Sequence, residues 1–131
     1  MRNLIAAFLG GAVGTALRLG LDAILVHHDD QFPWSTLIVN IVGSFALAVL
    51  AARVWPVAPA WLRVGLGPGL VGGFTTFSAV MVSMVTLAAS NEIVLALVYL
   101  VVTLVFGFGA AALGFLIAGR RGTDVPIEVD E

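Results

Sequence analysis

The sequence predicts an all-α membrane protein with four transmembrane helices, of which the third is broken. The 131 residues are 60% hydrophobic and only 11% charged, and their mean hydropathy is +1.10. Soluble domains are about half apolar, so a water-soluble fold could not bury this composition. Four apolar segments are each long enough to cross a bilayer, which takes about 20 helical residues. The third segment contains the stretch GLGPGLVGGFTTFSAV, whose glycines and proline predict the break.

The four segments are joined by short connections and form one predicted domain, residues 1–119. The connections read HHDDQFP, RVWPVAP and SNE, and each contains charges or turn-forming residues. Three tryptophans lie at predicted segment ends, where indole rings favour the membrane interface. Residues 120–131 are polar and acidic, and we expect them to form a disordered cytoplasmic tail. The segments are residues 4–26, 34–54, 61–89 and 93–118, and the tryptophans are Trp34, Trp55 and Trp61.

The arginines outside the predicted hydrocarbon region all lie on one side of the membrane. This side holds both termini and the second connection, whereas the first and third connections contain no lysine or arginine. Cytoplasmic loops carry an excess of positive residues, so we predict cytoplasmic termini. A bias of five to zero predicts insertion in a single direction, as a multi-pass protein of the inner or plasma membrane. The five residues are Arg2, Arg53, Arg63, Arg120 and Arg121.

The composition also argues against several classes of function. No cysteine is present, which excludes disulfide frameworks and thiolate metal sites. All six basic residues are arginines, and they form no basic stripe that would indicate a nucleic-acid partner. No nucleophile, base and orienting group converge in the spans, so we do not expect an enzyme.

Ionisable residues inside a membrane span are costly and mark either a paired structural group or a functional site. Only Arg18 and Asp22 qualify, and their spacing places them on one helical face, where they can pair. The pair could anchor the end of the first helix, or Arg18 could attract an anion with its permanent charge. His27 and His28 stand beside two aspartates, but a solvated loop is a better interpretation than a metal site.

The second segment contains one carboxamide, Asn40, in the apolar run TLIVNIVGSFALA. A buried asparagine can join neighbouring helices, or its amide can donate to a negatively charged ligand. The residues Gly43 and Ser44 follow one turn later on the same side. Both interpretations of Asn40 remain open from the residues alone.

The third segment combines its glycines and Pro68 with three hydroxyl side chains, Thr75, Thr76 and Ser78. Such a stretch could be a close-packed kink made of small residues. Alternatively, a helix broken at membrane depth faces a cavity and becomes an ion site. Its unwound carbonyls then suit a cation, whereas half-helix N-termini favour anions.

In the fourth segment, Tyr99, Thr103 and Gly107 recur every four residues and therefore share one face. This face could serve for packing alone or could form a polar lining. Overlapping pairs of small residues four apart allow close helix approach here and, through Gly10 and Gly14, in the first segment.

Three motifs together resemble the Fluc (CrcB) family of fluoride channels: GGAVGTALR, TLIVNIVGSF and GGFTTFS. The resemblance covers all four predicted spans. It implies an antiparallel dimer with two narrow pores and a central sodium ion, which is structural and is not transported. In this sequence, the sodium would bind the backbone carbonyls of Gly72 and Thr75.

The same resemblance implies the residues of the anion pathway. Asn40 would donate its amide, Phe77 would present a ring edge, and Arg18 would lie near the vestibule. The remaining members would supply hydroxyls, and they are Thr76, Ser78, Tyr99 and Thr103. Convergent donors can replace the water around fluoride without a fixed charge that would trap it. The implied function is passive export of fluoride from the cytoplasm, which lowers its toxicity.

Two positions depart from the family pattern. Val80 stands where the family commonly has a second pore phenylalanine, and Gly107 stands where it has a second hydroxyl. With the arginine bias, they suggest pairing with an oppositely oriented homologue. A non-conducting structural subunit is an alternative. A four-helix multidrug exporter is another, although Asp22 is a poor candidate for its required buried carboxylate.

Overall fold

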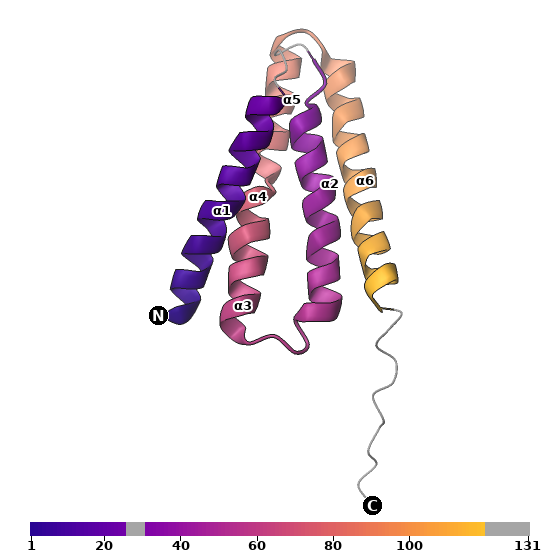
Figure 1. Ribbon diagram of the computed structural model, residues 1–131. Coiled ribbons are helices and arrows are strands. Elements are labelled where there is room, and N and C mark those ends of the chain that lie inside the picture. Colours follow the sequence, from indigo (N-terminus) through magenta and orange to yellow (C-terminus); the bar gives the residue numbers. More distant parts are fainter. Residues whose placement is uncertain (26–30, 120–131) are drawn as a thin grey trace, which may run out of the picture.

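The computed structural model describes residues 1–25 and 31–119 and confirms the four predicted membrane spans. Four helical stretches are long and apolar enough to cross a bilayer, and together they run through nearly all of the described chain (Figure 1). The predicted loop with His27, His28 and two aspartates lies outside the described residues, as does the predicted tail at 120–131 with its two arginines.

The first, second and fourth spans are nearly continuous helices. The first is α1, Arg2–Ile24, and the fourth is α6, Ile93–Gly119. The second consists of α2, Trp34–Val49, which continues into the π-helical turn η1, Leu50–Val54. Long apolar runs without proline explain this continuity, because every backbone group within the membrane must be bonded inside its own helix.

The third span is broken, as predicted, but the break does not fall at the proline or the glycines. It consists of α3, Ala60–Val64, the π-helical stretch η2, Gly65–Val71, a short α4, Gly72–Phe74, and α5, Phe77–Ala89. Pro68 lies inside η2 and is accommodated there by the wider helical turn. The chain leaves the helical conformation only at Thr75 and Thr76, which have extended backbones.

Helix α1 packs against the first half of the third span through glycines. A Cβ at Gly10 would overlap the carbonyl of Gly65, and one at Gly14 would overlap the carbonyl of Leu70. On the facing element, a Cβ at Gly73 would lie 2.7 Å from the Gly11 carbonyl oxygen. The two backbones therefore touch directly, as the small-residue spacing in the first span predicts.

Helix α2 packs against α6 in a similar way and is fastened to it at one end. A Cβ at Gly114 would lie 2.8 Å from both the Ala48 methyl and the Phe45 carbonyl oxygen. At the end of α6, Arg53 donates from Nη2 to the Ile117 carbonyl at 2.9 Å and from Nε to the Ala118 carbonyl at 3.3 Å. These carbonyls belong to the last turn, where no intrahelical donor is available.

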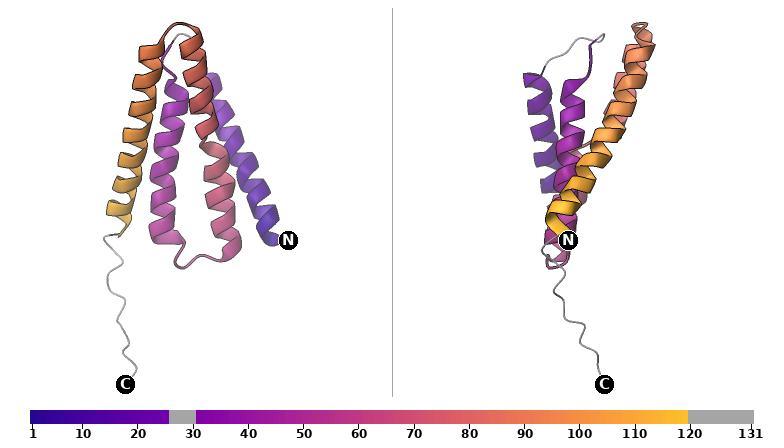
Figure 2. Two further views of the ribbon diagram at one scale, coloured as in Figure 1. Left: turned by 180° about the vertical axis from the view of Figure 1, so that it is seen from behind. Right: turned by 90° about the vertical axis from the view of Figure 1, so that its right-hand side faces the viewer.

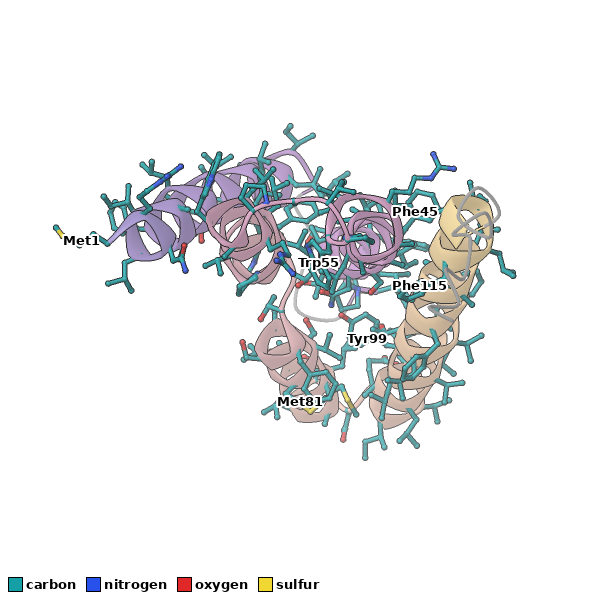
Figure 3. All side chains as sticks on the ribbon, turned by 90° about the horizontal axis from the view of Figure 1, so that it is seen from below. Met1, Phe45, Trp55, Met81, Tyr99 and Phe115 are labelled. Atoms are coloured by element: carbon teal, nitrogen blue, oxygen red, sulfur yellow. The ribbon has the colours of Figure 1, made fainter. Side chains whose placement is uncertain are left out.

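The second half of the third span, α5, packs against α6. Seen from the side, α5 and α6 lean away from α1 and α2 toward the end opposite the termini (Figure 2). Tyr99 of α6 points into the space between α2, α5 and α6 (Figure 3). It is fully buried there and packs with Leu37, Val80 and Leu87 in the hydrophobic core.

Both described ends of the chain, Met1 and Gly119, lie at the same end of the molecule (Figure 1). The connection between η1 and α3 lies there too, so Arg2, Arg53 and Arg63 gather at this end. Elsewhere the outward faces of the spans are apolar and exposed, for example at Phe8 and Val94. An apolar exterior of this extent suits lipid or a partner helix and does not suit water.

Candidate ion pathway at the broken helix

The break is built from two threonines whose backbones are extended. Thr75 has φ −85° and ψ 156°, and Thr76 has φ −160° and ψ 125°. Thr75 finishes the preceding helix, because its backbone N–H and its hydroxyl both donate to the Val71 carbonyl, at 2.8 and 2.9 Å. Residue 76 is therefore the first position at which the helical hydrogen-bond pattern fails.

Asn40 of α2 supplies the bonds that Thr76 lacks. The Thr76 N–H donates to Asn40 Oδ1 at 2.9 Å, and Asn40 Nδ2 donates to the Thr76 carbonyl at 3.2 Å. An N–H can only donate, so it fixes which end of the carboxamide faces it. The Nδ2 group carries a second hydrogen, which these two bonds leave unused.

At the break, two backbone carbonyls lose the N–H donors that a continuous helix would give them. In a continuous helix the Thr76 N–H would donate to the Gly72 carbonyl, but it donates to Asn40 instead. Likewise the Ala79 N–H, the helical donor for the Thr75 carbonyl, donates to the Thr76 hydroxyl at 3.3 Å. The Gly72 and Thr75 carbonyls thus lose their helical partners at the centre of the span.

The Thr76 hydroxyl also begins α5. By accepting from the Ala79 N–H it caps the helix, and it shares a 2.7 Å hydrogen bond with the Ser78 hydroxyl. The N-terminus of α5, whose first N–H groups have no acceptor within the helix and which carries partial positive charge, therefore lies beside Asn40.

Gly43 makes room for this arrangement. A Cβ at this position would overlap the Cγ2 methyl of Thr75. Gly43 lies one turn after Asn40 on the same side of α2, so the helix that bonds the break also makes room for the Thr75 side chain.

A pocket of about 260 Å³ lies over the break, between α2, the start of α5 and α6. Amide and hydroxyl groups from three elements meet apolar side chains in its wall. The lining residues are Asn40, Ser44, Thr75, Thr76, Phe77, Val80, Thr103, Leu104, Gly107 and Phe108.

The structure brings together most, but not all, of the residues predicted for the anion pathway. Asn40, Thr76, Phe77 and Thr103 line the pocket. Ser78 does not line the pocket, but its hydroxyl is hydrogen-bonded to that of the lining residue Thr76.

Tyr99 lies one helical turn from Thr103, behind the pocket wall. Its buried hydroxyl faces those of Thr36, Ser83 and Thr103 but makes no hydrogen bond of acceptable geometry within the described residues. The Thr103 hydroxyl is likewise buried and unpaired among these residues. Among the described residues, neither hydroxyl is committed to a hydrogen-bond partner.

Arg18 lies outside the pocket. It is on α1, which packs on the far side of the third span, and its Nε is 3.8 Å from Asp22 Oδ2. The predicted pair therefore forms, and both side chains are about one-third exposed, at 32% and 38%. This arrangement agrees with an anchoring role and brings neither group to the break.

Two lining residues, Leu104 and Phe108, were not predicted from the sequence. They follow Thr103 and Gly107 by one position each, so they lie at the edge of the same helical face. The repeat of polar and small residues every four positions predicted which side of α6 faces the pocket, but it did not indicate how far around the helix the pocket lining extends.

Comparison with known proteins places the chain in a family. The family profile described as CrcB-like protein, Camphor Resistance (CrcB), matches residues 5–115, which is most of the chain. The chain belongs to the CrcB family. The match reaches into all four spans and includes the break, so it covers the whole region in which the pocket lies.

Curated relatives of this chain carry the name Fluoride-specific ion channel. The chain is 39% identical over 124 residues to FluC 2 of Halalkalibacterium halodurans, with 94% of this chain and 90% of the relative covered. It is 40% identical over 124 residues to FluC of Allorhizobium ampelinum, covering 92% and 98%. It is 35% identical over 121 residues to FluC 1 of Mycobacterium bovis, covering 91% and 92%. With four apolar spans and these relatives, the chain is a multi-pass membrane protein.

Proposed function

We propose that this chain is a subunit of a fluoride-specific ion channel that lets fluoride leave the cytoplasm passively. The pocket over the break carries the proposal, because it gathers an amide, hydroxyls and an aromatic ring at membrane depth. The names of the curated relatives support the same function.

The chemistry of the pocket suits a small anion. Asn40 keeps one amide hydrogen free of the Thr76 backbone, and Thr103 has a hydroxyl that is unpaired among the described residues. The N-terminus of α5 adds backbone N–H groups and partial positive charge. Phe77 is 63% exposed and can present its positive ring edge. None of these groups carries a full charge, so an anion can be attracted and released again.

Fluoride efflux from liposomes containing the purified chain tests the proposal. Reconstitution from detergent does not impose one direction of insertion, so two copies of this chain can pair in opposite orientations. We therefore expect wild-type protein to release fluoride and not chloride, and both Asn40→Asp and Phe77→Ile to release it more slowly. Undiminished flux in both variants would reject this pocket as the pathway. Absence of flux from all three would contradict conduction by this chain alone, and would favour either a heterodimer or a non-conducting structural subunit, as the departures at Val80 and Gly107 suggest.

We also propose that a structural sodium ion binds at the break. The carbonyls of Gly72 and Thr75 have lost their helical donors to Asn40 and Thr76, and freed carbonyls are ligands that a hard cation accepts. Such an ion would hold the two halves of the third span in place and would not itself be carried. Higher thermal stability in sodium than in potassium is expected, and an equal melting temperature in both salts would contradict sodium binding.

The oligomeric arrangement is a further part of the proposal. We propose an antiparallel dimer, with the termini of this chain in the cytoplasm. The gathering of Arg2, Arg53 and Arg63 at one end of the molecule supports this direction of insertion. The chain contains no cysteine, so single cysteines can be placed freely. Labelling by an impermeant maleimide in intact cells is expected at Glu92→Cys and not at Arg2→Cys.

A chain that inserts in only one direction needs an oppositely oriented homologue to form such a dimer. Expression of this chain alone in fluoride-sensitive cells is therefore expected to give weak protection. Full protection without a partner would contradict the heterodimer. The multidrug-exporter alternative gains nothing from the structure, because Asp22 is paired with Arg18 outside the pocket.

A further inference from the structure

Two exposed phenylalanines stand at the pocket, and only one of them has a predicted role. Phe77 is the first residue of α5 and is 63% exposed, while Phe108 lies in the middle of α6 and is 73% exposed. Both line the pocket over the break. Their high exposure contrasts with Thr103, which is 7% exposed, so the rings lie at the mouth of the pocket and the hydroxyl at its depth.

The lining residues beside Phe108 are small or aliphatic. Its neighbour Gly107 has no side chain, and a Cβ there would meet only the Ser44 hydroxyl, at 3.9 Å. Val80 is fully buried and packs in the core with Leu37 and Leu87, so it adds an aliphatic wall. Among the lining residues, Phe77 and Phe108 are the two that carry aromatic rings.

We propose that Phe108 is a second anion-contacting ring, which acts beside Phe77 at the mouth of the pocket and helps to select fluoride over larger anions. This inference rests on the proposed channel function. A ring edge carries partial positive charge, and two edges from different helices can replace water on two sides of an anion. The attraction rises as distance falls, so the smallest halide gains most from a close approach.

The first test measures fluoride and chloride efflux from liposomes for ring-deleting variants. Phe108→Ile is expected to reduce fluoride flux about tenfold, and Phe108→Tyr, which keeps the ring, to stay within about twofold of wild type. Phe106→Ile is the matched control, because Phe106 is also exposed on α6, at 57%, but does not line the pocket. The control is expected to conduct like wild type.

The outcomes separate this inference from the function on which it rests. If Phe77→Ile is slow while Phe108→Ile conducts normally, the second ring is rejected and the channel assignment stands. If both variants conduct normally, the pocket is not the pathway, and both the proposed site and the inference fail.

A binding measurement keeps the inference testable when the chain alone does not conduct. 4-Fluorophenylalanine is placed at position 108 or, as a control, at position 106, and its ¹⁹F resonance is followed in detergent. Sodium fluoride is expected to shift the resonance at 108 only, and sodium chloride is expected to shift neither. No shift at 108, or equal shifts at both positions, would overturn the proposal.

Discussion

Asn40 and Thr76 are joined by two opposed hydrogen bonds, of 2.9 and 3.2 Å, that connect the middle of α2 to the break in the third span. The carboxamide takes the place of the helical neighbours that Thr76 has lost. A peptide unit left unpaired at membrane depth would be costly, so these bonds allow the break to exist. The asparagine is therefore both a helix-joining residue and a pocket residue, and the two interpretations of it are compatible.

Removal of the Asn40 carboxamide is expected to destabilise the protein. Asn40→Ala leaves the N–H and the carbonyl of Thr76 unpaired, which costs about 1–3 kcal/mol for each group. Asn40→Asp keeps an acceptor for the Thr76 N–H but sets a carboxyl group against the Thr76 carbonyl at membrane depth, so it should also be less stable than wild type. Thermal unfolding in detergent measures the order, and Asn3→Ala, an exposed asparagine of α1, is the control. Equal melting temperatures for wild type and Asn40→Ala would contradict the structural role.

The contact between Gly43 and Thr75 predicts a compensating pair of substitutions. Gly43→Ala places a methyl group against the Cγ2 of Thr75 and is expected to cost about 1–3 kcal/mol through overpacking. Thr75→Ser deletes that Cγ2 and keeps the hydroxyl bonded to Val71. The double variant should therefore recover most of the loss in melting temperature.

The matched control for this pair is Gly109→Ala, because a Cβ at Gly109 has no heavy atom within 4 Å. That substitution is expected to be neutral or slightly stabilising, since alanine is the better helix former. Additive losses in the double variant, with no recovery, would show that the clash with Thr75 is not the cause.

The Thr76 hydroxyl is expected to stabilise the start of α5. Thr76→Val keeps the shape and the backbone bonds to Asn40 but loses the cap on Ala79, at a cost of about 1 kcal/mol. Thr76→Ser retains the hydroxyl and should remain near wild type in melting temperature. The idea of a capping role would be abandoned if the valine and serine variants were equally stable.

Arg53 is expected to hold the end of α6 against η1. Its guanidinium donates to the carbonyls of Ile117 and Ala118, so Arg53→Gln should lower stability by about 0.5 kcal/mol through the lost interaction with the helix end. Arg63→Gln changes an exposed arginine at the same end of the molecule and controls for net charge. A larger loss in the Arg63 variant than in the Arg53 variant would argue against the cap.

The sequence determined the number and approximate bounds of the spans, because a bilayer requires long apolar segments and permits few exceptions. For the same reason, the few polar and helix-breaking residues within the segments identified the break and the residues around the pocket, among them Asn40 and Thr103. The predicted position of the break was less accurate. Pro68 and the glycines drew attention to the correct segment, but a π-helix accommodates them, and the chain unwinds at Thr75 and Thr76.

The tertiary structure alone decided what the break is made of and what faces it. Thr76 can leave the helix only because a residue of another span, Asn40, bonds its N–H and carbonyl. A peptide unit at membrane depth needs such a partner when it leaves a helix. In the same way, Phe108 and Phe106 are alike by sequence, and only the placement of α6 brings the first of them to the pocket. Hydrophobicity sets which segments span the bilayer, whereas packing and hydrogen bonding between the spans set the site.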